Sequence, residues 1–173
     1  EHGDVVPDIV TMAKGLTNAA VPMGAVAVKN EIYDAIVTGT SAGIEFFHGY
    51  TYSGHPLAAA AAIATLELHR AEDLPGRARA LEPYWQDAVH SLKGLPNVID
   101  IRDVGLIGAV ELAPRPGKPT QRALDVFRRC FDDGVLIRVT ADIIAMSPPL
   151  ICEKPHVDRL INTLAEALVA EAA

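Results

Sequence analysis

Apolar and polar positions follow two different patterns along the chain. In residues 1–73, two short apolar runs at 8–13 and 24–28 show no polar alternation, which is typical of buried strands. Residues 57–70 are rich in alanine and leucine, and Pro56 stands at the favoured first-turn position of a helix. We therefore expect two buried strands and a helix packed closely between other elements.

Two further features lie between these elements. Asn30 is expected to cap a short helix through Val37, with Glu31 in the first turn, where the helix dipole favours a carboxylate. Residues 38–43 are small, polar and glycine-bearing, so they are predicted to form a mobile surface loop.

Helical and strand patterns alternate after a boundary at Leu74 and Pro75. Thr120 is expected to cap one of the helices, and Gly134 to end it. The predicted elements are a helix at 77–92, strands at 98–102 and 106–112, a helix at 120–133, strands at 135–139 and 143–147, and a helix at 155–170. The fold class is therefore α/β, with a small α/β layer at 74–173 that carries its helices on one face.

Composition narrows the classes of function. Half of the 173 residues are hydrophobic, as in a globular protein, and 22 acidic against 15 basic residues give a formal net charge of −7. No basic run could follow a phosphate backbone, and no signal peptide or membrane-length apolar run is visible, so we expect a cytoplasmic protein without nucleic-acid or membrane partners. Cys130 and Cys152 lack metal-ligand spacing, which predicts reduced thiols and no metal site.

Lys14 is the first candidate for chemistry, because it follows the apolar run at 8–13 and precedes Gly15. A lysine ammonium is easily shifted towards its neutral form when desolvated, which suits it to Schiff-base formation with an aldehyde. The alternative is a lysine that ends a strand and extends its charge to water. Residues alone leave both interpretations open.

The segment at 46–56 is the second candidate. It contains two glycines, two histidines, two tyrosines, a threonine and a serine before Pro56, which predicts an extended loop able to offer hydroxyl and N–H groups to a phosphate. The alternative is a plain aromatic-rich turn, and for His48 or His55 alone a purely structural role is favoured.

Arg138 is the third candidate, because it interrupts the apolar run at 135–139. A guanidinium is expensive to bury without an anionic partner, and its planar fork suits a carboxylate. A structural salt bridge to Asp142, Asp100 or Glu111 and the carboxylate of a substrate are equally compatible with the spacing.

Taken together, these features resemble a known family. The chain looks like the carboxy-terminal portion of a class III, fold type I pyridoxal-phosphate aminotransferase, closest to the branch that transfers amino groups from β-alanine and other ω-amino donors to pyruvate. The similarity covers almost all residues. The stretches that carry it are 7–9 with 13–15, 22–25, 48–56, 97–102 with 105–106, and Arg138.

The resemblance implies a fold and a set of roles. Residues 1–73 would be the end of the large cofactor-binding domain with a long interdomain helix, and 74–173 the small domain. Lys14 would hold pyridoxal phosphate as an internal aldimine and then transfer protons. Tyr50 and Thr51 would bind the cofactor, Thr51 at the phosphate of the partner subunit, in a homodimer or dimer of dimers. Arg138 would bind the carboxylate of the amino donor or keto acid.

The resemblance also implies missing parts. In such enzymes the aspartate that pairs with the pyridine nitrogen, the ring-stacking aromatic residue and the phosphate turn precede the position of Glu1. We therefore expect a larger protein that is the transaminase, while this stretch alone is inactive. Two alternatives stay open: another class III enzyme, of the ornithine, 4-aminobutyrate or aminomutase type, and a non-catalytic α/β interaction module.

Overall fold

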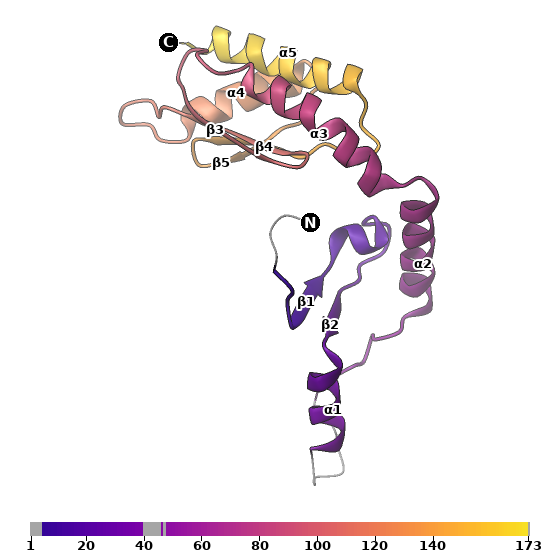
Figure 1. Cartoon of the computed structure of the whole chain (residues 1–173). Helices are drawn as coiled ribbons and strands as arrows, with labels where there is room; N and C mark the ends of the chain where they lie inside the picture. The colour runs from indigo at the N-terminus through magenta and orange to yellow at the C-terminus, as the bar shows by residue number, and fades with distance from the viewer. Residues whose placement is uncertain (1–4, 40–45, 47, 173) are drawn as a thin grey trace. The chain divides into compact units, whose positions relative to one another are not determined.

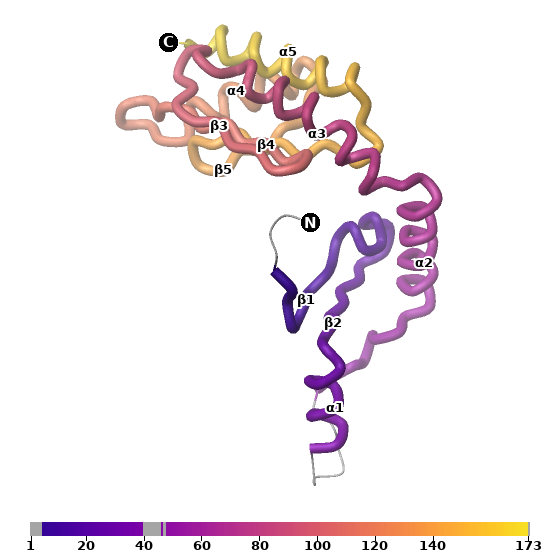
Figure 2. The backbone as a smooth tube through the Cα atoms, viewed as in Figure 1, coloured from indigo at the N-terminus to yellow at the C-terminus, as the bar shows by residue number. Residues whose placement is uncertain are grey.

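The structure is a computed structural model that describes residues 5–39, 46 and 48–172. It divides into two compact units, Glu1–Glu72 and Asp73–Ala173. Figure 1 labels the helices and strands of each unit, and Figure 2 follows the same chain as a tube. Among the described residues, none of the helices combines the length and hydropathy that a membrane span requires.

A two-stranded antiparallel sheet begins the first unit. Strand β1 (Ile9–Met12) pairs with β2 (Ala25–Val28) along its whole length. The 3-10 helix η1 (Lys14–Thr17) lies between the two strands in sequence. Both predicted strands are therefore confirmed, but the prediction that they are buried is wrong, because side chains on both are exposed. Two paired strands bury little unless other layers cover their faces.

Helix α2 (Pro56–Ala71) confirms the predicted helix and its start at Pro56. It packs against η1 and buries only Ala58, Ala62 and Thr65, which share one stripe of the helix. Larger apolar side chains such as Leu57 and Ile63 stay exposed. The expectation of a helix packed on several sides is therefore wrong for the described residues.

Helix α1 (Asn30–Thr38) was predicted in place, but its cap differs. Lys29, with extended backbone, holds the capping position and makes no capping hydrogen bond. Its ammonium pairs instead with Asp8 at 2.6 Å. Asn30 is thus the first helical residue, and the expectation that it caps the helix is wrong. The loop predicted at 38–43 lies mostly outside the described residues.

The second unit is a four-stranded antiparallel sheet with helices on one face (Figure 1). This confirms the predicted small α/β layer. The strand order is β3-β4-β6-β5. The elements are α3 (Leu74–His90), β3 (Val98–Val104), β4 (Ile107–Leu112), α4 (Gln121–Asp132), β5 (Arg138–Thr140), β6 (Ile143–Met146) and α5 (Lys154–Ala170).

The start of α3 and the capping contact of α4 differ from expectation for local reasons. Helix α3 begins three residues earlier than predicted, because the Asp73 side chain accepts a hydrogen bond from the Gly76 N–H and Pro75 is tolerated in a first turn. Thr120 does hold the capping position of α4, but its side chain makes no capping hydrogen bond. Instead the Asp142 carboxylate accepts the Thr120 N–H at 2.7 Å.

The strand predicted at 135–139 is shorter in the structure, since β5 begins at Arg138. Just before it, the Val135 N–H donates to the Cys130 carbonyl at 2.8 Å, which closes the end of α4. Gly134 has φ +78° at this helix end, as its predicted role requires.

The core of the second unit lies between the sheet and the helices. Trp85 and Val89 of α3 are fully buried, as are Val110 of β4 and Ile144 of β6. Gly108 lets the α3 side chains approach the sheet, because a Cβ atom there would lie 3.0 Å from the Trp85 ring. Helix and sheet therefore fit closely at this point.

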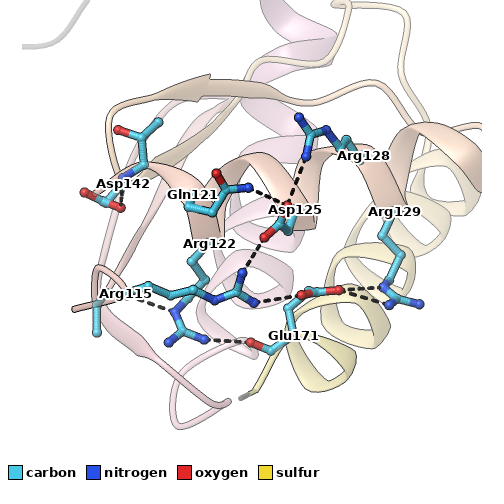
Figure 3. Close-up of polar contacts among 10 residues, drawn as sticks. Arg115, Gln121, Arg122, Asp125, Arg128, Arg129, Asp142 and Glu171 are labelled. Carbon is cyan, nitrogen blue, oxygen red and sulfur yellow. Dashed lines mark hydrogen bonds and ion pairs between the residues drawn. The ribbon is translucent and has the colours of Figure 1, made fainter. Parts of the chain in front are cut away.

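Arginine side chains fasten the end of α5 to the rest of the second unit (Figure 3). The Glu171 carboxylate pairs with Arg115 and Arg129, each at 2.9 Å. The Arg122 guanidinium, which is buried, donates to the Glu171 carbonyl at 2.7 Å. Arg115 also pairs with Asp125 of α4. We call Arg115, Arg122, Arg129, Asp125 and Glu171 the arginine cluster.

Asp125 shows the electrostatic effect of this cluster. Partial burial alone would raise the pKa of its carboxyl group, but hydrogen bonds from Gln121 and Arg115 outweigh burial and hold the pKa below its ordinary value. Asp125 therefore stays ionised, and the charges of the cluster remain paired.

Replacing Glu171 with glutamine tests the arginine cluster. We expect Glu171→Gln to lower the free energy of unfolding by about 1–2 kcal/mol, because two guanidinium groups lose their charged acceptor in a partly buried place. Glu166→Gln, an exposed position on α5, is the matched control and should change it by less than about 0.5 kcal/mol. Urea titration measures both, and equal losses would contradict the assignment.

Cys130 and Cys152 are both free thiols, as predicted. Cys130 is fully buried on α4, and this burial raises its pKa to about 11. Burial also raises the pKa of Cys152, which is only partly covered. The thiolate form of either residue is therefore disfavoured at neutral pH.

The raised pKa of Cys130 predicts a pH dependence. Because the folded pKa lies above the ordinary value of 9.0, ionisation opposes folding, and stability falls as pH rises from 9.0 towards about 11. At pH 8 iodoacetamide should modify Cys152 first and Cys130 only after unfolding. Mass spectrometry of the labelled peptides measures the order. Rapid labelling of Cys130 in the folded chain would contradict it.

Candidate functional site

Lys14 follows β1 after one residue, Ala13, and begins η1 with a left-handed backbone, at φ +55°. Asn18 and Ala19 are also left-handed. Residues other than glycine rarely adopt this backbone conformation, which costs them roughly 1–3 kcal/mol and occurs most often at functional sites. The Ala19 N–H donates to the Lys14 carbonyl at 3.1 Å, so the turn is closed by its own backbone.

Thr17 anchors this turn. Its side chain is 2% exposed, and its hydroxyl donates to the Val21 carbonyl at 2.6 Å. Because η1 also packs against α2, the strained backbone has a rigid support. The Lys14 side chain projects from this support and is exposed.

The structure settles part of the prediction for Lys14. Its place at the end of a strand is confirmed, whereas the expectation of a buried strand is wrong. Among the described residues, no hydrogen bond or ion pair involves the Lys14 ammonium. An exposed primary amine of this kind can condense with an aldehyde. Its catalytic role stays a prediction.

The hydroxyl-rich segment forms a turn before α2. The Tyr50 carbonyl accepts the Ser53 N–H at 2.9 Å, and Gly54 has φ +72°. Tyr50 and Thr51 are exposed, so the Thr51 hydroxyl is accessible to a ligand. The predicted loop is therefore present at 48–55, while Phe47 lies outside the described residues.

Aromatic contacts account for His48. Its ring packs edge-on against Tyr50, with 4.9 Å between ring centroids, and is stacked with Phe46 at 5.5 Å. This supports the structural interpretation of His48. His55 precedes α2 and makes no capping hydrogen bond.

Arg138 begins the edge strand β5 and is exposed. Its guanidinium avoids the cost of burial, because the neighbouring positions Ile137 and Val139 take the face that packs against the helices.

The carboxylates proposed as structural partners of Arg138 are engaged elsewhere. Arg102 pairs with Asp100 and, at 2.8 Å, with Glu111, and these contacts raise the pKa of its guanidinium. Asp142 accepts the Thr120 N–H. Within the described part of the chain no ion pair of Arg138 is present, so of the two alternatives left open by the sequence, the structural salt bridge is absent there.

A groove of about 640 Å³ lies beside Arg138. Its walls are mostly apolar and include Ala145, Met146 and Phe127, together with Ser147. The sequence analysis missed this groove. The alternation of inward and outward side chains along 143–147 could have indicated that Ala145 lies on the same face of the sheet as Arg138. The groove could not be predicted in this way, because it depends on how α4 and α5 pack.

The three candidates are divided between the two units. Lys14 and the segment with Tyr50 and Thr51 lie in the first unit, and Arg138 lies in the second. Their assembly into one site stays a prediction. In the described residues, no group of His, Cys, Asp or Glu could hold a metal ion.

Comparison with known proteins gives one consistent family. The family model described as aminotransferase class-III matches residues 1–168. An omega-aminotransferase from Caulobacter vibrioides is 60% identical over 97% of this chain and 38% of its own length. A beta-alanine–pyruvate aminotransferase from Pseudomonas aeruginosa is 39% identical over the same shares of the two chains.

Solved structures agree with the sequence matches. An amine transaminase from an uncultivated Pseudomonas species, in its PLP-bound form, matches with a TM-score of 0.87 and 34% identity. That match covers 98% of this chain and 39% of the other. The chain thus spans about 38% of the length of the curated relatives it matches.

The left-handed backbone at Lys14 predicts an unusual response to substitution. We expect Lys14→Gly to raise the free energy of unfolding by about 1 kcal/mol relative to Lys14→Ala, because glycine adopts positive φ without strain. Both variants remove the ammonium, so their difference isolates the backbone. Denaturant titration of the two variants measures it. Equal stabilities would show that the turn carries no strain.

Proposed function

The chain belongs to the class-III aminotransferase family, and we propose that the whole protein is a transaminase that moves an amino group from an ω-amino acid or amine, of the β-alanine kind, to pyruvate. The named activities of the relatives support this choice of donor and acceptor. The observation that carries it is the exposed amine of Lys14 on a strained turn at the end of β1.

The residues present fit pyridoxal phosphate, the cofactor of this family. Lys14 offers an accessible primary amine that could hold the cofactor aldehyde covalently, and Tyr50 and Thr51 lie on an exposed turn that offers a hydroxyl group and backbone N–H groups to a phosphate. When bound, the cofactor supplies the electron sink that stabilises a carbanion at the substrate carbon.

Each residue then has a defined task. With the cofactor bound, Lys14 Nζ would act as the general base and acid that accepts a proton from one carbon and returns it to another. Thr51 binds phosphate through its hydroxyl and N–H groups. Arg138 binds the carboxylate of the donor or keto acid with its planar fork.

The proposal includes an assembly. Thr51 would serve the cofactor of a partner subunit, so the active protein would be a homodimer or a dimer of dimers with shared sites. We also propose a cytoplasmic location. Because this chain spans about 38% of its relatives' length, we expect it to lack transaminase activity when it is tested without the remainder of the protein.

Borohydride trapping tests the proposal. The whole protein is mixed with pyridoxal phosphate, reduced, digested and analysed by mass spectrometry. We expect a pyridoxyl adduct on Lys14, because its exposed amine ends a strand on a supported turn. Lys14→Ala should lose the adduct, whereas Lys29→Ala, a control lysine paired with Asp8, should keep it.

The same protein is then assayed with β-alanine as donor and with pyruvate or 2-oxoglutarate as acceptor. A higher rate with pyruvate would support the proposed acceptor. The absence of a selective adduct at Lys14 would refute the cofactor assignment, and a preference for 2-oxoglutarate would refute the acceptor.

A further inference from the structure

The buried hydroxyl group of Thr17 ties the turn of Lys14 to the segment that leads back into β2. Backbone hydrogen bonds close the turn within residues 13–20, since the N–H groups of residues 18–20 donate to carbonyl groups earlier in the turn at 3.0 to 3.2 Å. The Thr17 hydroxyl reaches one residue further and donates to the Val21 carbonyl at 2.6 Å. In the part of the chain that the structure describes, no other hydrogen bond reaches that carbonyl.

The hydroxyl bond differs from the backbone bonds in its shielding from water. The donors of the backbone bonds, residues 18–20, are exposed, whereas the Thr17 side chain is buried. A hydrogen bond shielded from water is electrostatically stronger, and a shielded acceptor that loses its donor is costly. The Thr17 hydroxyl is therefore the side-chain contact on which the shape of the turn depends.

The turn requires such a contact because its backbone is strained. Lys14, Asn18 and Ala19 have φ values of +55°, +49° and +57°, which side chains other than hydrogen disfavour. The backbone conformation of Lys14 sets the direction of its Cα–Cβ bond and hence the region that Nζ can reach. A turn that relaxed to ordinary φ values would therefore displace the amine.

We propose that Thr17 is a positioning residue for the transaminase reaction, because its hydroxyl group holds the turn that directs Lys14 Nζ at the reacting carbons. This inference rests on the proposed transaminase function. A displacement of about 1 Å at a catalytic group can lower a rate about a hundredfold. Binding of the substrate carboxylate is assigned to Arg138, so loss of the Thr17 hydroxyl should affect kcat rather than KM.

Kinetics of the whole protein test the inference. Thr17→Val keeps the shape of the side chain and removes the hydrogen-bond donor. We expect its kcat with β-alanine and pyruvate to fall about tenfold, while both KM values change less than about threefold. Thr17→Ser keeps the hydroxyl group and should hold kcat within about twofold of the native value.

Thr65→Val is the matched control. Thr65 is also a buried threonine of the first unit, and its hydroxyl donates to the Ala61 carbonyl at 2.8 Å. That carbonyl lies within α2 and keeps its helical N–H partner when the hydroxyl is removed. This variant should keep kcat and both KM values. If Thr17→Val does not fold, Thr17→Cys takes its place, because a thiol is a weak donor of similar shape to serine.

A second measurement does not depend on turnover. The whole protein is freed of cofactor, mixed with pyridoxal phosphate and reduced with borohydride after successive times, and peptide mass spectrometry gives the rate at which Lys14 is modified. Thr17→Val should lower this rate at least about threefold, because the amine is no longer held towards the aldehyde. Thr17→Ser and Thr65→Val should keep the native rate.

These outcomes separate the inference from the proposed function. A native protein with neither adduct nor turnover would refute the function, and the inference would fall with it. A native protein with both, and a Thr17→Val variant equal to it in kcat or in trapping rate, would overturn the inference alone. A loss in KM instead of kcat, no recovery in Thr17→Ser, or an equal loss in Thr65→Val would also overturn it. A loss of kcat that serine restores, together with slower trapping at Lys14, supports it.

Discussion

The second unit depends on the burial of one face of its sheet under α3, α4 and α5. Because successive side chains of a strand point to opposite faces, the two neighbours of every residue packed against the helices point away from them. Val110 and Ile144 are fully buried, and this leaves Ala109, Ala145 and Arg138 on the other face. A slip of one residue would drive the guanidinium into the core, where an unpaired charge is costly.

The first unit places its candidate residue by backbone geometry. It buries few side chains, and the residues that it does bury, such as Thr17 and Ala62, support the turn that begins at Lys14. A lysine keeps a left-handed backbone conformation only where surrounding contacts hold it in place. Here those contacts are the hydrogen bond of the Thr17 hydroxyl and the packing of η1 on α2. The direction of the Lys14 side chain is therefore a property of the turn rather than of a core.

Much of this could be predicted, because period-two and period-3.6 patterns report the type of each element. The helix caps could not be predicted. Lys29 holds the capping position expected for Asn30. The Asp142 carboxylate makes the hydrogen bond at the start of α4, where the Thr120 side chain was expected to cap the helix. The prediction that the strands of the first unit are buried failed for a similar reason. An apolar strand indicates that burying its side chains would be favourable. Whether they are buried depends on other helices and strands, which the pattern of that strand does not reveal.

Arg138 shows how far alternation alone could have gone. Ile137 and Val139 flank it, so the sequence already indicated that the arginine takes the face opposite to theirs. What the sequence could not indicate is pairing: Arg102 forms ion pairs with two carboxylates, whereas Arg138 forms none among the described residues. A guanidinium already held by acids must break those contacts before it binds a substrate. A free one only has to become ordered, and this difference is why Arg138, rather than Arg102, is the candidate for a substrate carboxylate.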